Sequence, residues 1–230
     1  MSLSPRVKTG IVELDRMLNG GFLRGDSILL AGSAGTGKST LCLQYLIQGV
    51  ADGEAGIYLT FEELPDQLYR DATNMGWDLR KLEKENKLRV ICTSPDVLIE
   101  PEGIQAILEG PIREINAKRI AVDSLSHFNM FVKAPDLRLE IYRAVMFFKT
   151  KHLSSLLCWE SLQSTGQTFA VSEEGISFLT DCVVLLKFVR LNAMSPVGVA
   201  ASSQPFGFGD SSHVLPVSAF STMSQMQPFC

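Results

Sequence analysis

The sequence predicts an α/β fold in which a mostly parallel central β-sheet is flanked by helices on both faces. Short, continuous apolar runs alternate along the chain with amphipathic stretches. This alternation is typical of buried parallel strands and the helices that connect them. A glycine-rich loop also joins an early apolar run directly to a stretch of helical spacing, which predicts a strand–turn–helix unit near the start of the chain.

The individual elements follow from the spacing of the apolar residues. Strands are predicted at residues 27–31, 56–61, 88–93, 119–125, 155–159 and 182–189. Helices are predicted at residues 38–50, 65–75, 103–115 and 136–151. In the last helix, one face carries Leu137, Ile141, Ala144, Val145 and Phe148, and we expect this face to pack on the sheet. Met146 and Phe147 could instead form part of a groove for a partner.

Composition narrows the class of protein. The chain has 230 residues, of which 46% are hydrophobic and 20% charged, with a net charge of −4. These values indicate a globular protein without a general attraction to nucleic acid. The five cysteines form no CxxC pair, so we expect mostly buried free thiols rather than a zinc or disulfide site. No segment resembles a secretory signal or a membrane span, which favours a cytoplasmic protein with no membrane association.

The composition changes near the C-terminus. Residues 192–230 contain no Lys, Arg or Glu and are rich in Ser, Pro and Phe. No helical or alternating period continues there. We therefore predict one nucleotide-binding domain at residues 1–191. The remaining 192–230 would be a tail that is poorly ordered or docks on a partner.

The glycine-rich loop has the residues and the context of a phosphate-binding P-loop. A predicted strand runs into the loop and a predicted helix follows it, as this motif requires. The glycines allow the backbone amides to approach phosphate oxygens at the start of a helix. Lys38 would contact the β- and γ-phosphates, and the Ser39 hydroxyl would bind Mg²⁺. The predicted phosphate contacts are Gly32, Ser33, Ala34, Gly35, Thr36, Gly37, Lys38, Ser39 and Thr40.

Hydrolysis would require carboxylates at the ends of neighbouring strands, because ligands bind at the carboxyl edge of such sheets. Asp123 ends the apolar run 119–123 and is the predicted second Mg²⁺ contact, in the Walker B position. Glu62 is the predicted base that activates water, with Glu63 as the alternate. The alternative for these two acids is the first turn of the next helix, where the helix dipole would stabilise them. Asp123 could likewise cap a turn.

Three other polar residues keep open interpretations. Glu160 could sense the γ-phosphate or only terminate its strand. His127 could take part in catalysis, but we interpret it as a loop histidine. Asp181 precedes the last predicted strand and receives no role.

These residues resemble the opening and core of a KaiC-type ATPase domain, in the RecA/DnaB branch of P-loop proteins. The resemblance covers about residues 5–191. It includes Tyr58-Leu59-Thr60-Phe61-Glu62-Glu63, where such domains carry paired catalytic glutamates, and Ile120-Ala121-Val122-Asp123-Ser124 at Walker B. Further matches are Thr9-Gly10-Ile11, Leu14-Asp15, Gly20-Gly21, Gly25, Glu160 and Phe178-Leu179-Thr180-Asp181.

The resemblance implies a RecA-like core that binds ATP and Mg²⁺ and assembles as a homo-oligomeric ring, commonly a hexamer, with ATP at subunit interfaces. It implies an ATPase that drives a signalling or regulatory switch. Such domains usually carry a Lys-x-Arg pair beyond the last strand, and residues 192–230 contain neither residue type. We therefore expect slow turnover unless Lys187, Arg190 or a partner substitutes.

Two other functions use the same fold. A DNA recombination or repair ATPase would need basic loops facing the ring axis. The candidate loops at residues 123–136 and 163–175 contain a single lysine, Lys133, and no arginine. DNA is therefore an unlikely partner. A nucleotide-binding scaffold without significant turnover is the other alternative, and it differs from the slow ATPase only in rate.

Overall fold

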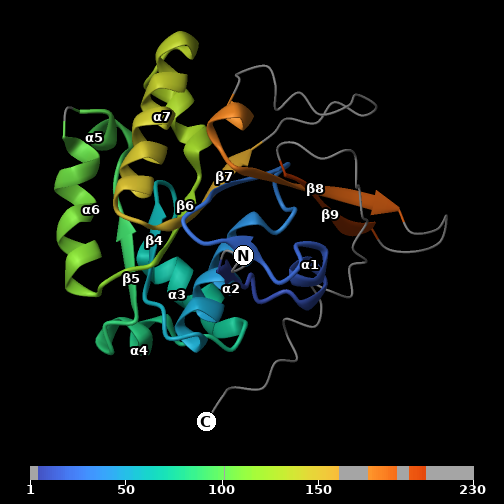
Figure 1. Ribbon diagram of the computed structural model, residues 1–230. Coiled ribbons are helices and arrows are strands. Elements are labelled where there is room, and N and C mark those ends of the chain that lie inside the picture. Colours follow the sequence, from blue (N-terminus) through green and yellow to red (C-terminus); the bar gives the residue numbers. More distant parts are fainter. Residues whose placement is uncertain (1–4, 101, 161–175, 191–196, 206–230) are drawn as a thin grey trace.

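The computed structural model describes residues 5–100, 102–160, 176–190 and 197–205. A seven-stranded sheet forms its centre, in the order β5-β4-β6-β7-β3-β8-β9 (Figure 1). The first six strands in this order are parallel, and β9 is antiparallel to β8. The strands are β3 (Ser27–Gly32), β4 (Gly56–Thr60), β5 (Leu88–Cys92), β6 (Arg119–Asp123), β7 (Ser154–Glu160), β8 (Cys182–Arg190) and β9 (Val197–Pro205). The predicted α/β class and parallel sheet are confirmed.

Helices cover both faces of this sheet (Figure 1). The longer ones are α2 (Lys38–Ala51), α3 (Pro65–Asn74), α6 (Gly103–Glu114) and α7 (Ala134–Thr150). Shorter elements are α1 (Val12–Met17), α4 (Leu79–Lys84), α5 (Pro95–Ile99) and the 3₁₀ turns η1 (Leu125–Met130) and η2 (Ile176–Leu179). A separate two-stranded ribbon pairs β1 (Arg6–Val7) with β2 (Phe22–Leu23).

Strand β3 shows why the sequence folds into two layers of helices around one sheet. Ile28 and Leu30 belong to the core that α1, α2 and α3 cover, whereas Leu29 and Ala31 belong to the core under α6 and α7. Successive side chains of a strand point to opposite faces, so a strand buried on both sides must be apolar throughout. All six residues of β3 are buried.

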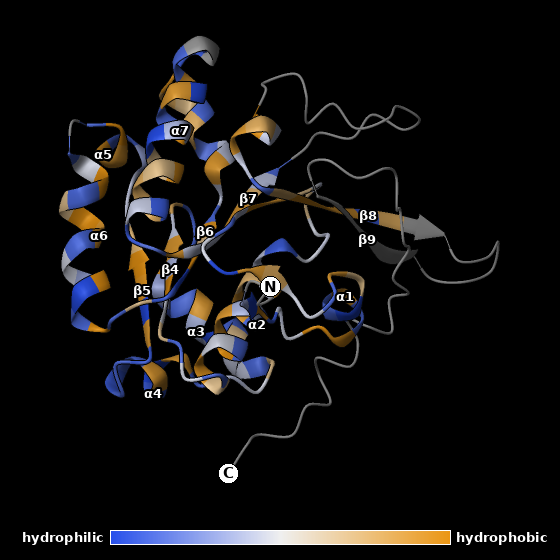
Figure 2. Cartoon of the chain, in the orientation of Figure 1, coloured by the Kyte–Doolittle hydropathy of each residue, from blue (hydrophilic) through white to orange (hydrophobic). Residues whose placement is uncertain are grey.

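Helix α7 confirms the predicted amphipathic face, whose five apolar residues are all buried. Met146 is 40% exposed on the outer side of the helix. Figure 2 shows the same division between apolar and polar positions in α6 and α7. The helix begins at Ala134, two residues before the predicted start, with a proline at one of its first two positions. Proline is suited to that place because its missing N–H would have no partner there.

Several elements were not predicted from the sequence. The short α1, α4 and α5 have too few turns to show a clear period. Strand β9 lies within the segment that the sequence analysis treated as a tail, and it pairs with β8 along its whole length, from Arg190↔Val197 to Cys182↔Pro205. Residues 206–230, the rest of that segment, lie outside the described residues, so the boundary at residue 191 stays a prediction.

The start of β6 is anchored by a buried cation. The Arg119 side chain is 1% exposed and forms ion pairs with Glu54 at 2.7 Å and Asp52 at 3.2 Å. Its guanidinium also donates to the backbone oxygens of Lys8 (2.7 Å) and Tyr45 (3.0 Å). These contacts join the end of α2, the N-terminal segment and the sheet, and so fix α2 against β6.

Candidate nucleotide site

The glycine-rich loop connects β3 to α2 at the carboxyl edge of the sheet. Gly35 and Gly37 have φ angles of 76° and 90°, in the left-handed region that favours glycine. At Gly32, a Cβ atom would lie 2.6 Å from Oγ1 of Thr36 and 2.8 Å from the Leu186 oxygen, so no larger residue fits. The start of the loop therefore packs tightly against the Thr36 side chain and β8, which requires glycine at position 32.

Lys38 begins α2 and is only 9% exposed. Its Nζ donates to the backbone oxygens of Gly32 and Ser33, each at 3.0 Å. The Thr36 hydroxyl donates to the same Ser33 oxygen at 2.8 Å. The ammonium group therefore lies across the start of the loop, and only loop carbonyls bind it among the described residues.

Asp123, the predicted Walker B carboxylate, lies at the same edge of the sheet. Asp123 ends β6, where it pairs in register with Thr60 of β4. The buried Tyr58 hydroxyl donates to Oδ2 of Asp123 at 2.7 Å. Burial, and then the charge of Asp123, raise the pKa of Tyr58 well above its usual value, which keeps the hydroxyl protonated as a donor. The sequence analysis missed Tyr58 as a partner of Asp123, since register between strands is not visible in a sequence.

Two buried thiols meet where α2 packs on β7. Burial raises the pKa of Cys42 on α2; the nearby Asp123 charge also raises it, and Lys38 lowers it. The Sγ atoms of Cys42 and Cys158 are 3.1 Å apart, and both cysteines are free and buried. The predicted buried thiols are found here and at Cys182, whereas Cys92 is exposed.

The two candidate glutamates differ in their surroundings. The Glu62 side chain is 79% exposed and its Oε2 lies 3.1 Å from Nε2 of His127. Glu63 is less exposed, and its N–H donates to Oγ1 of Thr60 at 3.2 Å. Burial raises the pKa of the Glu63 carboxyl, and the charges of Asp71 and Asp123 add to this effect. Both glutamates precede α3, which begins at Pro65, and neither belongs to it.

The remaining candidates fall in different places. His127, interpreted from the sequence as a loop histidine, lies in η1 and contacts Glu62. Glu160 is exposed at the end of β7, and its N–H donates to Oγ of Ser126 at 2.6 Å. Asp181 lies at the opposite edge of the sheet, where Oδ2 accepts from the Ser27 N–H at 2.8 Å.

The oxygen-bearing side chains near the loop are suited to Mg²⁺ bound together with phosphates. The described part of the chain holds no cluster of three or more His, Cys, Asp or Glu side chains suited to a metal. Mg²⁺ in phosphate sites needs no such cluster, because it binds one or two protein oxygens together with phosphates and water. Asp123 and the exposed Ser39 hydroxyl would supply these oxygens.

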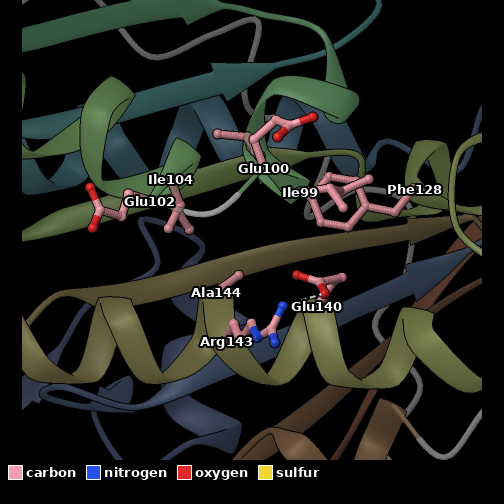
Figure 3. A pocket seen from close by; sticks show the side chains of 9 residues that line it. Ile99, Glu100, Glu102, Ile104, Phe128, Glu140, Arg143 and Ala144 are labelled. Atoms are coloured by element: carbon pink, nitrogen blue, oxygen red, sulfur yellow. Dashed lines mark hydrogen bonds and ion pairs between the residues drawn. The ribbon is translucent and has the colours of Figure 1, made fainter.

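A cavity of about 220 Å³ lies away from the loop, between α5, α6 and α7 (Figure 3). Its wall is apolar at Phe128 and Ile104 and acidic at Glu100 and Glu140. No P-loop residue lines it. Phe128 nevertheless connects it to the candidate site, since its ring centroid is 5.5 Å from that of Phe61, the residue before Glu62.

Comparison with known proteins assigns this arrangement to a family. The model of the KaiC ATPase family matches residues 7–197. The chain belongs to the KaiC ATPase family. The circadian clock protein KaiC3 of Synechocystis is 34% identical over 186 residues, which cover 81% of this chain and 36% of that protein. The circadian clock oscillator protein KaiC of Synechococcus elongatus is 31% identical over 190 residues, which cover 83% of this chain and 36% of that protein.

The family assignment confirms the resemblance inferred from the motifs, and the RecA-like α/β core belongs with it. The chain spans little more than a third of the length of these two KaiC relatives. Membership of the KaiC family indicates that the chain contains a P-loop nucleotide-binding domain. The roles of individual residues stay predictions. Among the helices that the structure describes, none is long and apolar enough to cross a membrane.

Proposed function

We propose that this KaiC-family domain binds ATP with Mg²⁺, hydrolyses it slowly and uses the nucleotide state to control a homo-oligomeric signalling or regulatory switch in the cytoplasm. The observation that carries the proposal is the glycine-rich loop of residues 32–39 at the start of α2, with the buried Lys38 across it. The amides of such a loop and the helix dipole favour a bound triphosphate.

Binding would begin with the exchange of partners by Lys38. Its ammonium group, now bonded to two loop carbonyls, would turn to the β- and γ-phosphates. Thr40 would contact the α-phosphate. Mg²⁺, when bound, neutralises phosphate charge, and Ser39 and Asp123 would hold it. The Tyr58 hydroxyl leaves Oδ1 of Asp123 available for this purpose.

Hydrolysis would depend on Glu62, which would orient a water molecule and accept its proton. Its exposure gives it access to water, and its carboxylate makes no hydrogen bond or ion pair with the described residues except that with His127. Glu63 is the alternate base. Its raised pKa supports this alternative, because a base with a pKa nearer to neutral accepts protons more effectively.

Slow turnover is proposed because residues 192–230 supply no arginine or lysine. A trans-acting arginine contributes on the order of 10³–10⁵ in rate, or about 4–7 kcal/mol of barrier. Lys187 and Arg190 in β8 are the candidates for a substitute. If neither acts, the domain would be a nucleotide-binding scaffold.

Assembly into a ring, with ATP between subunits, is proposed from family membership. A ring would place the exposed Glu62 and Ser39 against a neighbouring subunit. A DNA-dependent ATPase finds less support: the loop 123–136 contains one lysine, Lys133, and no arginine. The other loop considered, residues 163–175, lies outside the described residues.

The decisive experiment compares wild type with Lys38→Ala in Mg-ATP titrations and in light scattering with and without Mg-ATP. We expect the wild type to bind Mg-ATP and its light-scattering mass to change as the oligomeric state changes. The Lys38→Ala variant should lose most of its affinity for Mg-ATP. Lys118→Ala, which removes an exposed lysine, is the matched control. Full affinity in a folded Lys38→Ala protein would refute the proposal.

A further inference from the structure

Both nitrogens of the His127 ring lie close to an oxygen atom, one in a hydrogen bond and the other at ion-pair distance. Nδ1 lies 3.0 Å from the backbone oxygen of Ser124. Nε2 lies 3.1 Å from Oε2 of Glu62. A carbonyl oxygen only accepts, so Nδ1 carries the proton of its hydrogen bond to Ser124. A neutral ring in this tautomer would present the Nε2 lone pair to the Glu62 carboxylate, so the ion pair exists only when Nε2 carries a proton as well.

Packing keeps the ring in this position. The His127 side chain is 20% exposed, whereas the Glu62 side chain is 79% exposed. The ring centroid lies 6.4 Å from that of Phe61, and Phe61 packs on Phe128. The backbone N–H of His127 also donates to the Ser124 oxygen, at 3.2 Å. The histidine is therefore the fixed member of the pair, and the glutamate is the mobile one.

Charged side chains of both signs lie on the elements around η1. The carboxylates on these elements are Glu62 and Glu63 after β4, Asp123 at the end of β6 and Glu160 at the end of β7. Glu100 and Glu140 line the nearby cavity. The cations on the adjoining part of α7 are Arg143, which pairs with Glu140 at 2.6 Å, the exposed Arg138, and Lys133 at its start.

We propose that His127 is a positioning residue for Glu62, which holds the carboxylate when the ring is protonated and releases it when the ring is neutral. The proposal rests on the proposed role of Glu62 as the base. A carboxylate paired with an imidazolium is a weaker proton acceptor, so the paired state suppresses hydrolysis. The ATPase would thus become faster as pH rises and the ion pair is lost. Ion pairs with one exposed partner are weak, so we expect an effect of about two- to fivefold.

The first test measures the ratio of the ATPase rate of His127→Phe to that of wild type between pH 6 and pH 8.5. Phenylalanine keeps a ring against Phe61 and carries no proton. The titration of ATP itself cancels in the ratio. We expect about two- to fivefold at pH 6, falling to about one at pH 8.5. His127→Gln, which donates without charge, should change in the same direction by a smaller factor.

The matched control is His152→Asn. His152 lies after α7 with a φ of 57°, a conformation that asparagine tolerates. Its rate ratio to wild type should stay flat with pH. A flat ratio for both His127→Phe and His127→Gln would overturn the proposal.

A second test does not depend on hydrolysis. The ¹⁵N shifts of the imidazoles distinguish the doubly protonated ring from the neutral one, and the chain has only three histidines. At one pH near the midpoint, Glu62→Gln should lower the ratio of protonated to neutral His127 by about two- to fivefold and leave His152 unchanged. An unchanged His127 would refute the pair even if Glu62 is the base. A lowered ratio in a protein without ATPase activity would instead refute the proposed hydrolysis alone.

Discussion

The buried hydroxyl of Tyr58 donates a 2.7 Å hydrogen bond to Oδ2 of Asp123, the carboxylate predicted for the Walker B position. The two residues lie on neighbouring strands, β4 and β6, which pair in parallel. Burial keeps the tyrosine protonated, so the hydroxyl acts only as a donor to the carboxylate. This bond orients the Asp123 carboxylate that we propose as a Mg²⁺ ligand.

Tyr58→Phe should therefore weaken binding of Mg-ATP by about tenfold, because a partner that orients a metal ligand has been removed. Binding of ATP without Mg²⁺ should change little. Titrations of ATP with and without Mg²⁺ measure the difference. Tyr45→Phe is the control, since Tyr45 is also buried and donates to the Ser154 oxygen at 3.2 Å, away from Asp123. Equal losses in the two variants would contradict the assignment.

Glu62→Gln and Glu63→Gln separate the two candidate bases. Replacing the base should reduce kcat by about 10²–10⁴ while ATP affinity holds, and we expect this result for Glu62→Gln. Glu63→Gln should have the smaller effect. Single-turnover hydrolysis of radiolabelled ATP is sensitive enough for a slow enzyme. The reverse order would assign the role to Glu63, whose pKa is raised.

Arg119→Met should strongly destabilise the fold. It removes the buried cation between Glu54 and Asp52 and leaves two backbone oxygens without their donor, a change that costs about 3–5 kcal/mol in the free energy of unfolding. Arg24→Ala removes the other, more exposed partner of Glu54 and should cost about 0–1 kcal/mol. Urea unfolding of both variants measures the contrast. Equal costs would show that burial of Arg119 does not matter.

Asp26 should make stability fall as pH rises. Burial and then the charge of Asp181 raise the pKa of Asp26 from 3.8 to about 6. Between these values the folded state binds more protons than the unfolded state, so unfolding becomes easier as pH increases from about 4 to about 6. Because the side chain is only half buried, we expect a loss of about 1–2 kcal/mol after allowance for solvent screening.

Asp26→Asn should abolish this slope and be the more stable protein at pH 8, as measured by urea unfolding at pH 4, 6 and 8. Asp181→Asn should instead destabilise, because Asp181 accepts from the Ser27 N–H and pairs with Lys149 at 2.8 Å. An Asp26→Asn variant that keeps the slope of wild type would contradict the prediction.

The sequence by itself determined the strands β3 to β8, the four long helices and the phosphate loop, because each depends on local spacing. Buried parallel strands need uninterrupted apolar runs, and the loop needs glycines between a strand and a helix. The same locality explains why the KaiC resemblance could be stated from motifs alone and was confirmed over residues 7–197.

Only the tertiary structure decided which side chains meet. The Tyr58–Asp123 bond depends on strand register, and the Glu62–His127 pair joins residues separated by two strands and the helices between them. Strand β9 has too little apolar alternation to be recognised and is defined by its pairing with β8. Such contacts arise from the packing of distant segments, whose energies do not appear in any local pattern of residues.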